Sequence, residues 1–76
     1  MGELLADLAR RLVDDPDAVR VDEIERDGAV VLQLHVAKDD VGQVIGRQGR
    51  IARALRTVVR AGAARSHRRV LVEIVD

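Results

Sequence analysis

The hydrophobic residues at the start of this chain recur at positions that share one side of a helix. The leucines involved are Leu4, Leu5, Leu8 and Leu12, and Pro16 follows them. An apolar stripe of this kind buries one face of a helix, and proline ends the run because it has no amide hydrogen to donate. The pattern predicts a helix from about Glu3 to Val13.

Apolar and polar residues then alternate along the chain, which is typical of strands. The alternation predicts one strand from about Val19 to Ile24 and a second from Val30 to Val36. Asp27-Gly28 between them favours a two-residue turn, so the two strands should pair antiparallel. Ile24 is out of phase with the valines before it, which predicts either a bulge near residues 22 and 23 or a change of facing along the strand.

The second half of the chain predicts two helices and a final strand. A short helix is expected from Val41 to Ile45, because Asp39 or Asp40 can cap its start and Gly46 can end it.

A longer helix is expected to begin after Gly49 and to run to about Arg65, and the alternation of Val70–Val75 predicts the last strand. The buried side of the longer helix is expected to consist of Ile51, Leu55, Val58, Val59 and Gly62, and to face away from Arg53, Arg56 and Arg60.

These elements follow the order αββααβ, which indicates an α+β protein. Parallel strands need a long crossover connection, and the two helices between the second and third strands supply one. We therefore expect a three-stranded mixed sheet with the helices packed on one face. With only 76 residues, the chain is too short for two separate cores, so residues 1–76 should form a single domain.

The composition excludes several classes of protein. Hydrophobic residues make up 47% of the chain, enough for a folded core, and the absence of cysteine excludes a disulfide framework and any thiolate metal site. No segment is apolar enough to span a membrane, and residues 1–7 lack the basic start and apolar run of a signal peptide. We expect a soluble, cytoplasmic protein.

The charges are distributed unevenly along the chain although they sum to zero. Residues 1–40 carry five basic and eleven acidic side chains, a net charge of −6, whereas residues 41–76 carry eight arginines and two acids, a net charge of +6. The eight arginines lie between Arg47 and Arg69 with no acid among them. This suggests an anionic partner, and the alternative is a solvated basic helix paired with the acidic half.

The candidate chemistry lies in the turn Gly46-Arg47-Gln48-Gly49 between the two helices. Its two glycines let the backbone approach a bulky group and adopt dihedral angles that a Cβ would forbid. Backbone amides at the start of the next helix have no intrahelical acceptor and can receive a phosphate. Arg47 and Arg50 add positive charge, and Gln48 adds neutral donors. An ordinary turn after a helix-ending glycine is the alternative interpretation.

The sequence resembles a K-homology (KH) domain of type II, the arrangement in which an extra helix and strand come first. The resemblance covers the whole chain and is carried by Leu12 to Asp17, Val44 to Ile51 and Arg56 to Val59. It points to the small, stand-alone bacterial KH proteins of the KhpA type, which are RNA-binding proteins regarded as RNA chaperones. The resemblance therefore implies the type II KH fold and a post-transcriptional role.

By this resemblance, Gly46, Arg47, Gln48 and Gly49 grip the backbone of a single RNA strand, with Arg50 beside them. Val44, Ile45 and Ile51 help line an apolar groove that holds about four nucleotides. The resemblance also implies a homodimer, or a complex with a second KH-containing protein of the KhpB type.

The arginines of the longer helix fit two interpretations. Arg53, Arg56 and Arg60 either extend the phosphate track from the loop or keep an exposed helix soluble. We favour the second interpretation for Arg60, which lies far along the helix from the loop.

The chain contains no Phe, Tyr or Trp. Stacking of bases on aromatic rings, worth about 1 to 3 kcal/mol per base, is therefore absent. We expect weak, weakly sequence-selective binding by one domain, so that useful affinity requires a second copy or a partner. The edge strand Val70–Val75 carries few charges and is a candidate dimerisation surface.

Neither catalysis nor a bound metal or cofactor is expected. His35 and His67 lie far apart without a cluster of further ligands, and Ser66 next to His67 lacks an orienting acid and an oxyanion loop. The acidic residues between Asp14 and Asp27 are expected to form a solvated face, which could also repel RNA or dock a basic partner.

The sequence thus predicts a KH module that binds single-stranded RNA without chemistry. The alternative is a KH-like protein-interaction module, used for dimerisation, with little or no RNA binding.

Overall fold

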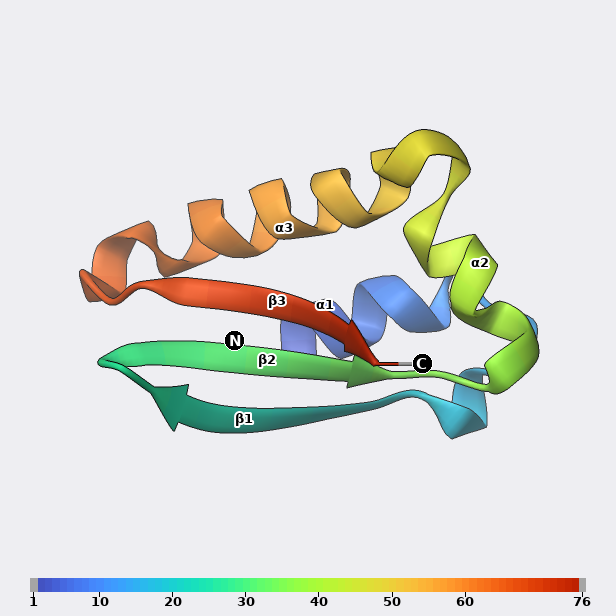
Figure 1. Ribbon diagram of the computed structural model, residues 1–76, viewed down its shortest axis with the longest axis horizontal. Helices are drawn as coiled ribbons and strands as arrows, with labels where there is room; N and C mark the ends of the chain where they lie inside the picture. Colours follow the sequence, from blue (N-terminus) through green and yellow to red (C-terminus); the bar gives the residue numbers. More distant parts are fainter. Residues whose placement is uncertain (1, 76) are drawn as a thin grey trace.

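The computed structural model describes residues 2–75 and has the predicted element order (Figure 1). Its helices are α1 (Gly2–Arg10), α2 (Val41–Ile45) and α3 (Arg50–Ala63), and its strands are β1 (Arg20–Arg26), β2 (Ala29–His35) and β3 (Val70–Val75). Short 3₁₀ turns connect them: η1 (Pro16–Ala18), η2 (Lys38–Asp40), η3 (Arg47–Gly49) and η4 (Ala64–Ser66). The predicted α+β order αββααβ is confirmed.

The three strands form a mixed sheet in the order β1-β2-β3. β1 pairs antiparallel with β2, and β2 pairs parallel with β3, as the connections predicted. The hairpin turn is made by Asp27 and Gly28, whose φ angles of 53° and 80° are those of a primed two-residue turn. β3 lies at an edge of the sheet, and α3 runs above it in the opposite direction (Figure 1).

The first hairpin contains no bulge. Pairing runs without interruption from Arg20 opposite His35 to Arg26 opposite Ala29. Ile24 keeps the phase of its strand and lies opposite Val31, on the sheet face that the helices leave open. The bulge is therefore wrong and the change of facing is correct: the apolar residues of β1 serve both faces of the sheet.

The core lies between the sheet and the helices. Leu32 and Leu34 of β2 are fully buried there, together with Leu5 of α1, Val44 of α2 and Val59 of α3. The helix face of β2 thus follows the predicted alternation. α1 ends at Arg10, earlier than expected, because the chain then leaves the helix through a turn in which Leu12 is exposed.

The predicted buried side of α3 is partly wrong. The residues that are buried form the stripe Ala52, Leu55, Val59 and Ala63, at helical spacing. Val58 is 43% exposed, because it precedes the buried Val59 by one residue and so points about 100° away from it. Gly62 is also exposed. Two of these four residues are alanines, so hydrophobic size alone did not predict the buried stripe.

A polar network crosses the open face of the sheet. Glu73 of β3 lies opposite Gln33 of β2 and accepts hydrogen bonds from Gln33 Nε2 at 3.3 Å and from the Arg26 guanidinium at 3.0 Å. The hydrogen bond from Gln33 and then the hydrogen bond and charge of Arg26 lower the pKa of Glu73 below its ordinary value of 4.5. The network therefore joins all three strands through an ionised carboxylate.

Replacing Glu73 should flatten the dependence of stability on acid pH. Because the folded state lowers this pKa, the ionised carboxylate stabilises the fold at pH values above about 4.5, and that contribution is lost as the pH falls through the lowered value. Urea denaturation of Glu73→Gln between pH 3 and 6 should show a shallower change in unfolding free energy than the unaltered chain. Gln33→Ala, which removes one donor, should give an intermediate profile. Identical profiles for Glu73→Gln and the unaltered chain would contradict the network.

Asp40 holds the start of α2 against a distant loop. Its side chain is buried, with 3% exposure, and accepts the backbone amides of Asp14 at 3.3 Å and Asp15 at 3.1 Å. The sequence predicted Asp39 or Asp40 as the cap of α2. Asp40 does occupy the capping position, but its side chain makes no capping hydrogen bond because it faces the 14–15 segment instead. This carboxylate fixes where α2, and the turn that follows it, begins.

Removal of the Asp40 carboxylate should destabilise the protein. Asp40→Ala leaves two part-buried amides without an acceptor, so the unfolding free energy from urea denaturation should fall by about 2 to 3 kcal/mol. Asp39→Ala, at the exposed neighbouring position, is the control and should change it by less than about 0.5 kcal/mol. Equal effects of the two substitutions would show that the Asp40 contact contributes nothing special.

Candidate nucleic-acid interface

The turn between α2 and α3 has the geometry that its two glycines predicted. α2 ends at Ile45, and Gly46 takes φ 75° and ψ 171°, a combination that is nearly restricted to glycine. The Gly46 amide donates to the Gly42 carbonyl at 2.9 Å, and the Gly49 amide donates to the Gly46 carbonyl at 3.1 Å. Two hydrogen bonds therefore close a tight, defined loop immediately before α3 begins.

Gly46 is required here for space as well as for its dihedral angles. A Cβ at this position would lie 2.4 Å from Ile51 Cγ1 and 2.9 Å from the Ile51 amide nitrogen. The first turn of α3 thus packs directly on the backbone of the loop. At Gly49 the constraint is conformational only, since its φ is 73° but nothing lies within 4 Å of an added Cβ.

Gln48 also adopts a left-handed conformation, with φ 58°. The Arg53 guanidinium, one turn into α3, donates a hydrogen bond to the Gln48 carbonyl at 3.0 Å. Arg53 therefore braces the loop from the side of the helix. Arg53 was a candidate for the phosphate track, with helix solubility as the alternative, and the structure adds this bracing contact, which a spacing of five residues did not predict.

The positive charges of the loop have no acidic neighbours. Among residues 2–75, the arginines that form ion pairs are Arg10, Arg20, Arg26 and Arg68. Arg47 and Arg50 are exposed and belong to none of these pairs within the described part of the chain. Within the described residues, the one arginine of the basic half that pairs with an acid of the acidic half is Arg68, which lies 2.9 Å from Glu25, and the loop arginines have no such pair.

The aliphatic residues beside the loop differ in whether a ligand could reach them. Ile45 is 37% exposed at the end of α2, and Ile51 is half-buried against Gly46. Val44 was expected to line the groove, but its side chain is fully buried in the core. Its contribution is therefore to anchor α2 beneath the loop, while Ile45 and Ile51 are the aliphatic groups that a ligand could reach.

Both histidines lie away from this loop. His35 Nε2 is 3.1 Å from Asp22 Oδ2 on the open sheet face, without the alignment that a hydrogen bond needs. His67 ends the η4 turn, at the far end of α3, with φ 56°. Within residues 2–75 no three His, Cys, Asp or Glu side chains gather closely enough to hold a metal ion. None of the helices in the same range is long and apolar enough to cross a membrane.

The element order and the glycine-bounded turn together define a KH domain of type II. The family model "KhpA/KhpB, KH domain" matches residues 2–74. The chain therefore belongs to the KhpA/KhpB family of KH domains.

Individual relatives agree with this assignment. The chain is 52% identical over 75 residues to RNA-binding protein KhpA of Caldanaerobacter subterraneus, covering 99% of this chain and 100% of the relative. It is 49% identical over 75 residues to the protein of that name from Clostridium acetobutylicum, with the same coverage. Identity to the Treponema pallidum protein of that name is 53% over 74 residues, covering 97% of this chain and 92% of the relative. The comparison with solved structures found no significant match.

Substitution of the glycines should separate the two constraints on the loop. Gly46→Ala combines a clash with Ile51 and a forbidden dihedral, so we expect a loss of about 3 kcal/mol or more in unfolding free energy. Gly49→Ala meets only the dihedral penalty and should cost about 1 to 2 kcal/mol. Gly42→Ala is the matched control, because it lies within α2 with open space around it and should be neutral or stabilising by up to about 1 kcal/mol. A Gly46→Ala variant as stable as Gly49→Ala would contradict the close contact with Ile51.

Proposed function

We propose that this protein binds single-stranded RNA, holding the sugar-phosphate backbone at the Gly46-Arg47-Gln48-Gly49 loop. The observation that carries the proposal is a rigid, glycine-bounded loop whose two neighbouring arginines, Arg47 and Arg50, are exposed and have no carboxylate partner within residues 2–75. The printed names of the relatives, RNA-binding protein KhpA, support the same activity.

The residues of the loop have distinct roles in this proposal. The glycines bring the main chain close to the strand, and the positive end of the α3 dipole attracts its phosphates. Arg47 and Arg50 contribute charge, and Gln48 donates neutral hydrogen bonds. Ile45 and Ile51 offer an aliphatic surface on which the bases rest. No step in this account makes or breaks a covalent bond, so the proposed activity is binding without catalysis.

The affinity of one copy should be modest, because the chain has no aromatic side chain on which bases can stack. We therefore propose that the protein works as a pair, either with a second copy or with a second KH-containing chain of the KhpB type. Two linked sites raise the effective concentration of each loop along one RNA and so multiply weak affinities. The model description that names KhpA and KhpB together supports this arrangement.

The loop assignment is tested by reversing its charge. Arg47→Asp combined with Gln48→Asp should abolish binding of a short single-stranded RNA measured by fluorescence anisotropy, while far-ultraviolet circular dichroism stays unchanged. In the unaltered chain, the logarithm of the association constant should fall with the logarithm of salt concentration by about 0.7 per phosphate, for about two to four phosphates.

A matched control separates a local effect from one of total charge. Arg11→Glu with Arg65→Gln changes the net charge by the same −3 at two exposed positions outside the loop, and should reduce binding much less. Undiminished binding by the loop variant would overturn the site. A folded, self-associating chain that binds no RNA would instead support the protein-interaction alternative.

A further inference from the structure

We propose that the hollow between the end of α3 and the start of β3 is a second phosphate site, which extends the RNA footprint beyond the loop. This inference rests on the proposed function and adds a second contact to it. The hollow has a volume of about 290 Å³ and is lined by Arg60, Ala63, Ala64, His67, Arg68, Arg69, Val70 and Leu71. Its ligand class is the phosphodiester of a single strand that is already held at Gly46–Gly49.

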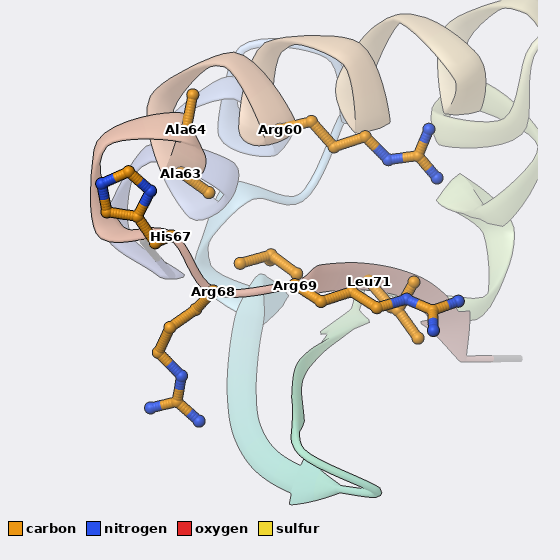
Figure 2. Close-up of a pocket in the computed structure, with 8 residues that line it drawn as sticks. Arg60, Ala63, Ala64, His67, Arg68, Arg69 and Leu71 are labelled. Atoms are coloured by element: carbon orange, nitrogen blue, oxygen red, sulfur yellow. The ribbon is translucent and has the colours of Figure 1, made fainter.

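The hollow has cationic walls on two sides. Arg60 extends from α3 on one side and Arg69 from the residue before β3 on the other, and both guanidinium groups reach in the same direction along the groove (Figure 2). Arg68 points away from the hollow (Figure 2) and pairs with Glu25 of β1 at 2.9 Å. Two arginines that flank one hollow from separate elements can both contact a phosphate placed between them, because each guanidinium presents a planar pair of donors.

The charge of the hollow is not neutralised by the rest of the described chain. None of its lining residues is acidic, and within residues 2–75 no carboxylate forms an ion pair with Arg60 or Arg69. A solubilising role for Arg60 does not explain why a second arginine, Arg69, lies on the other side of the same hollow. The sequence-based preference for Arg60 as a solubility residue is therefore replaced by a binding role.

The backbone around the hollow is held in place. The Ser66 hydroxyl donates to the Ala63 carbonyl at 2.8 Å and accepts the Arg68 amide at 3.4 Å. The Arg69 carbonyl accepts the Val30 amide at 2.9 Å, which ties this segment to β2. The Cα of Arg69 is therefore fixed relative to the sheet, as that of Arg60 is fixed by α3, so the two walls keep their separation.

The hollow and the loop lie at opposite ends of α3 (Figure 1). Arg60 follows Gly49 by eleven residues, which corresponds to about 16 Å along a helix. A strand held at the loop must cross this distance before it reaches the hollow. A KH loop clamps about four nucleotides. A strand longer than this minimal ligand is therefore needed to fill both sites.

The experiment compares two lengths of oligouridylate, a tetranucleotide and a dodecanucleotide, by NMR titration and fluorescence anisotropy. The test variant is Arg60→Gln with Arg69→Gln. The control is Arg11→Gln with Arg65→Gln, which removes the same charge at exposed positions that do not line the hollow. Urea denaturation of each variant verifies that the fold is intact.

The test variant should bind the tetranucleotide within about twofold of the unaltered chain and the dodecanucleotide about five- to tenfold more weakly. Its salt slope on the dodecanucleotide should be shallower by about 0.7, one phosphate. The control should match the unaltered chain on both ligands.

Three results would overturn the second site: no change in the test variant, equal losses in test and control variants, or equal losses on both lengths. Tetranucleotide binding by the unaltered chain reports on the proposed function alone. If the unaltered chain binds neither the tetranucleotide nor the dodecanucleotide, both proposals are overturned. If it binds the tetranucleotide and any of the three results is found, only the second phosphate site is overturned.

Discussion

The site depends on one close contact, in which the side chain of Ile51 packs against the backbone of Gly46. An added Cβ would lie 2.4 Å from Ile51 Cγ1, so only glycine permits the first turn of α3 to approach the end of α2 this closely. Between this contact and the start of α3 the chain passes through the left-handed residues Gln48 and Gly49. The contact between Ile51 and Gly46 thus positions the side chains that are exposed at the loop.

The support for this contact comes from parts of the chain that are distant in sequence. Val44 anchors α2 in the core, and the buried carboxylate of Asp40 ties the start of that helix to the amides of Asp14 and Asp15. The segment that joins α1 to the sheet therefore helps to place α2, which leads into the loop. One acidic residue of the first half, Asp40, thus has a structural role, because its buried carboxylate accepts two backbone amides inside the fold.

Although the net charge of the chain is zero, its acidic residues lie mostly in the first half and its basic residues mostly in the second half. Among residues 2–75, four arginines are paired with acids, and three of these arginines belong to the first half. Of the second-half arginines, Arg68 alone is paired with a carboxylate of residues 2–75, and the others run from the loop along α3 to the hollow. When aromatic stacking is absent, single-stranded nucleic acid is recognised largely through its phosphates. The unpaired arginines are therefore the main groups on this surface that could attract such a strand.

The sequence was sufficient for the elements, the hairpin turn and the glycine loop, because each depends on local chemistry. Asp27-Gly28 and Gly46 require positive φ angles that few other residues adopt, so their consequences can be predicted without a structure. It was not sufficient for features that depend on distant partners. The facing of Ile24 depends on the register with β2, and the role of Asp40 depends on amides 25 and 26 residues away. The placement of Arg60 and Arg69 on two sides of one hollow likewise depends on how α3 lies over β3.

The most direct test of the central claim is a residue-by-residue map of RNA binding on the folded chain. In an amide NMR titration of the ¹⁵N-labelled protein with a short single-stranded RNA, binding at the loop predicts that the largest chemical-shift changes occur at residues 46–51. The amides of Gln33 and Glu73 on the open sheet face should move little. Shifts that are largest on that face, with residues 46–51 unmoved, would contradict the account.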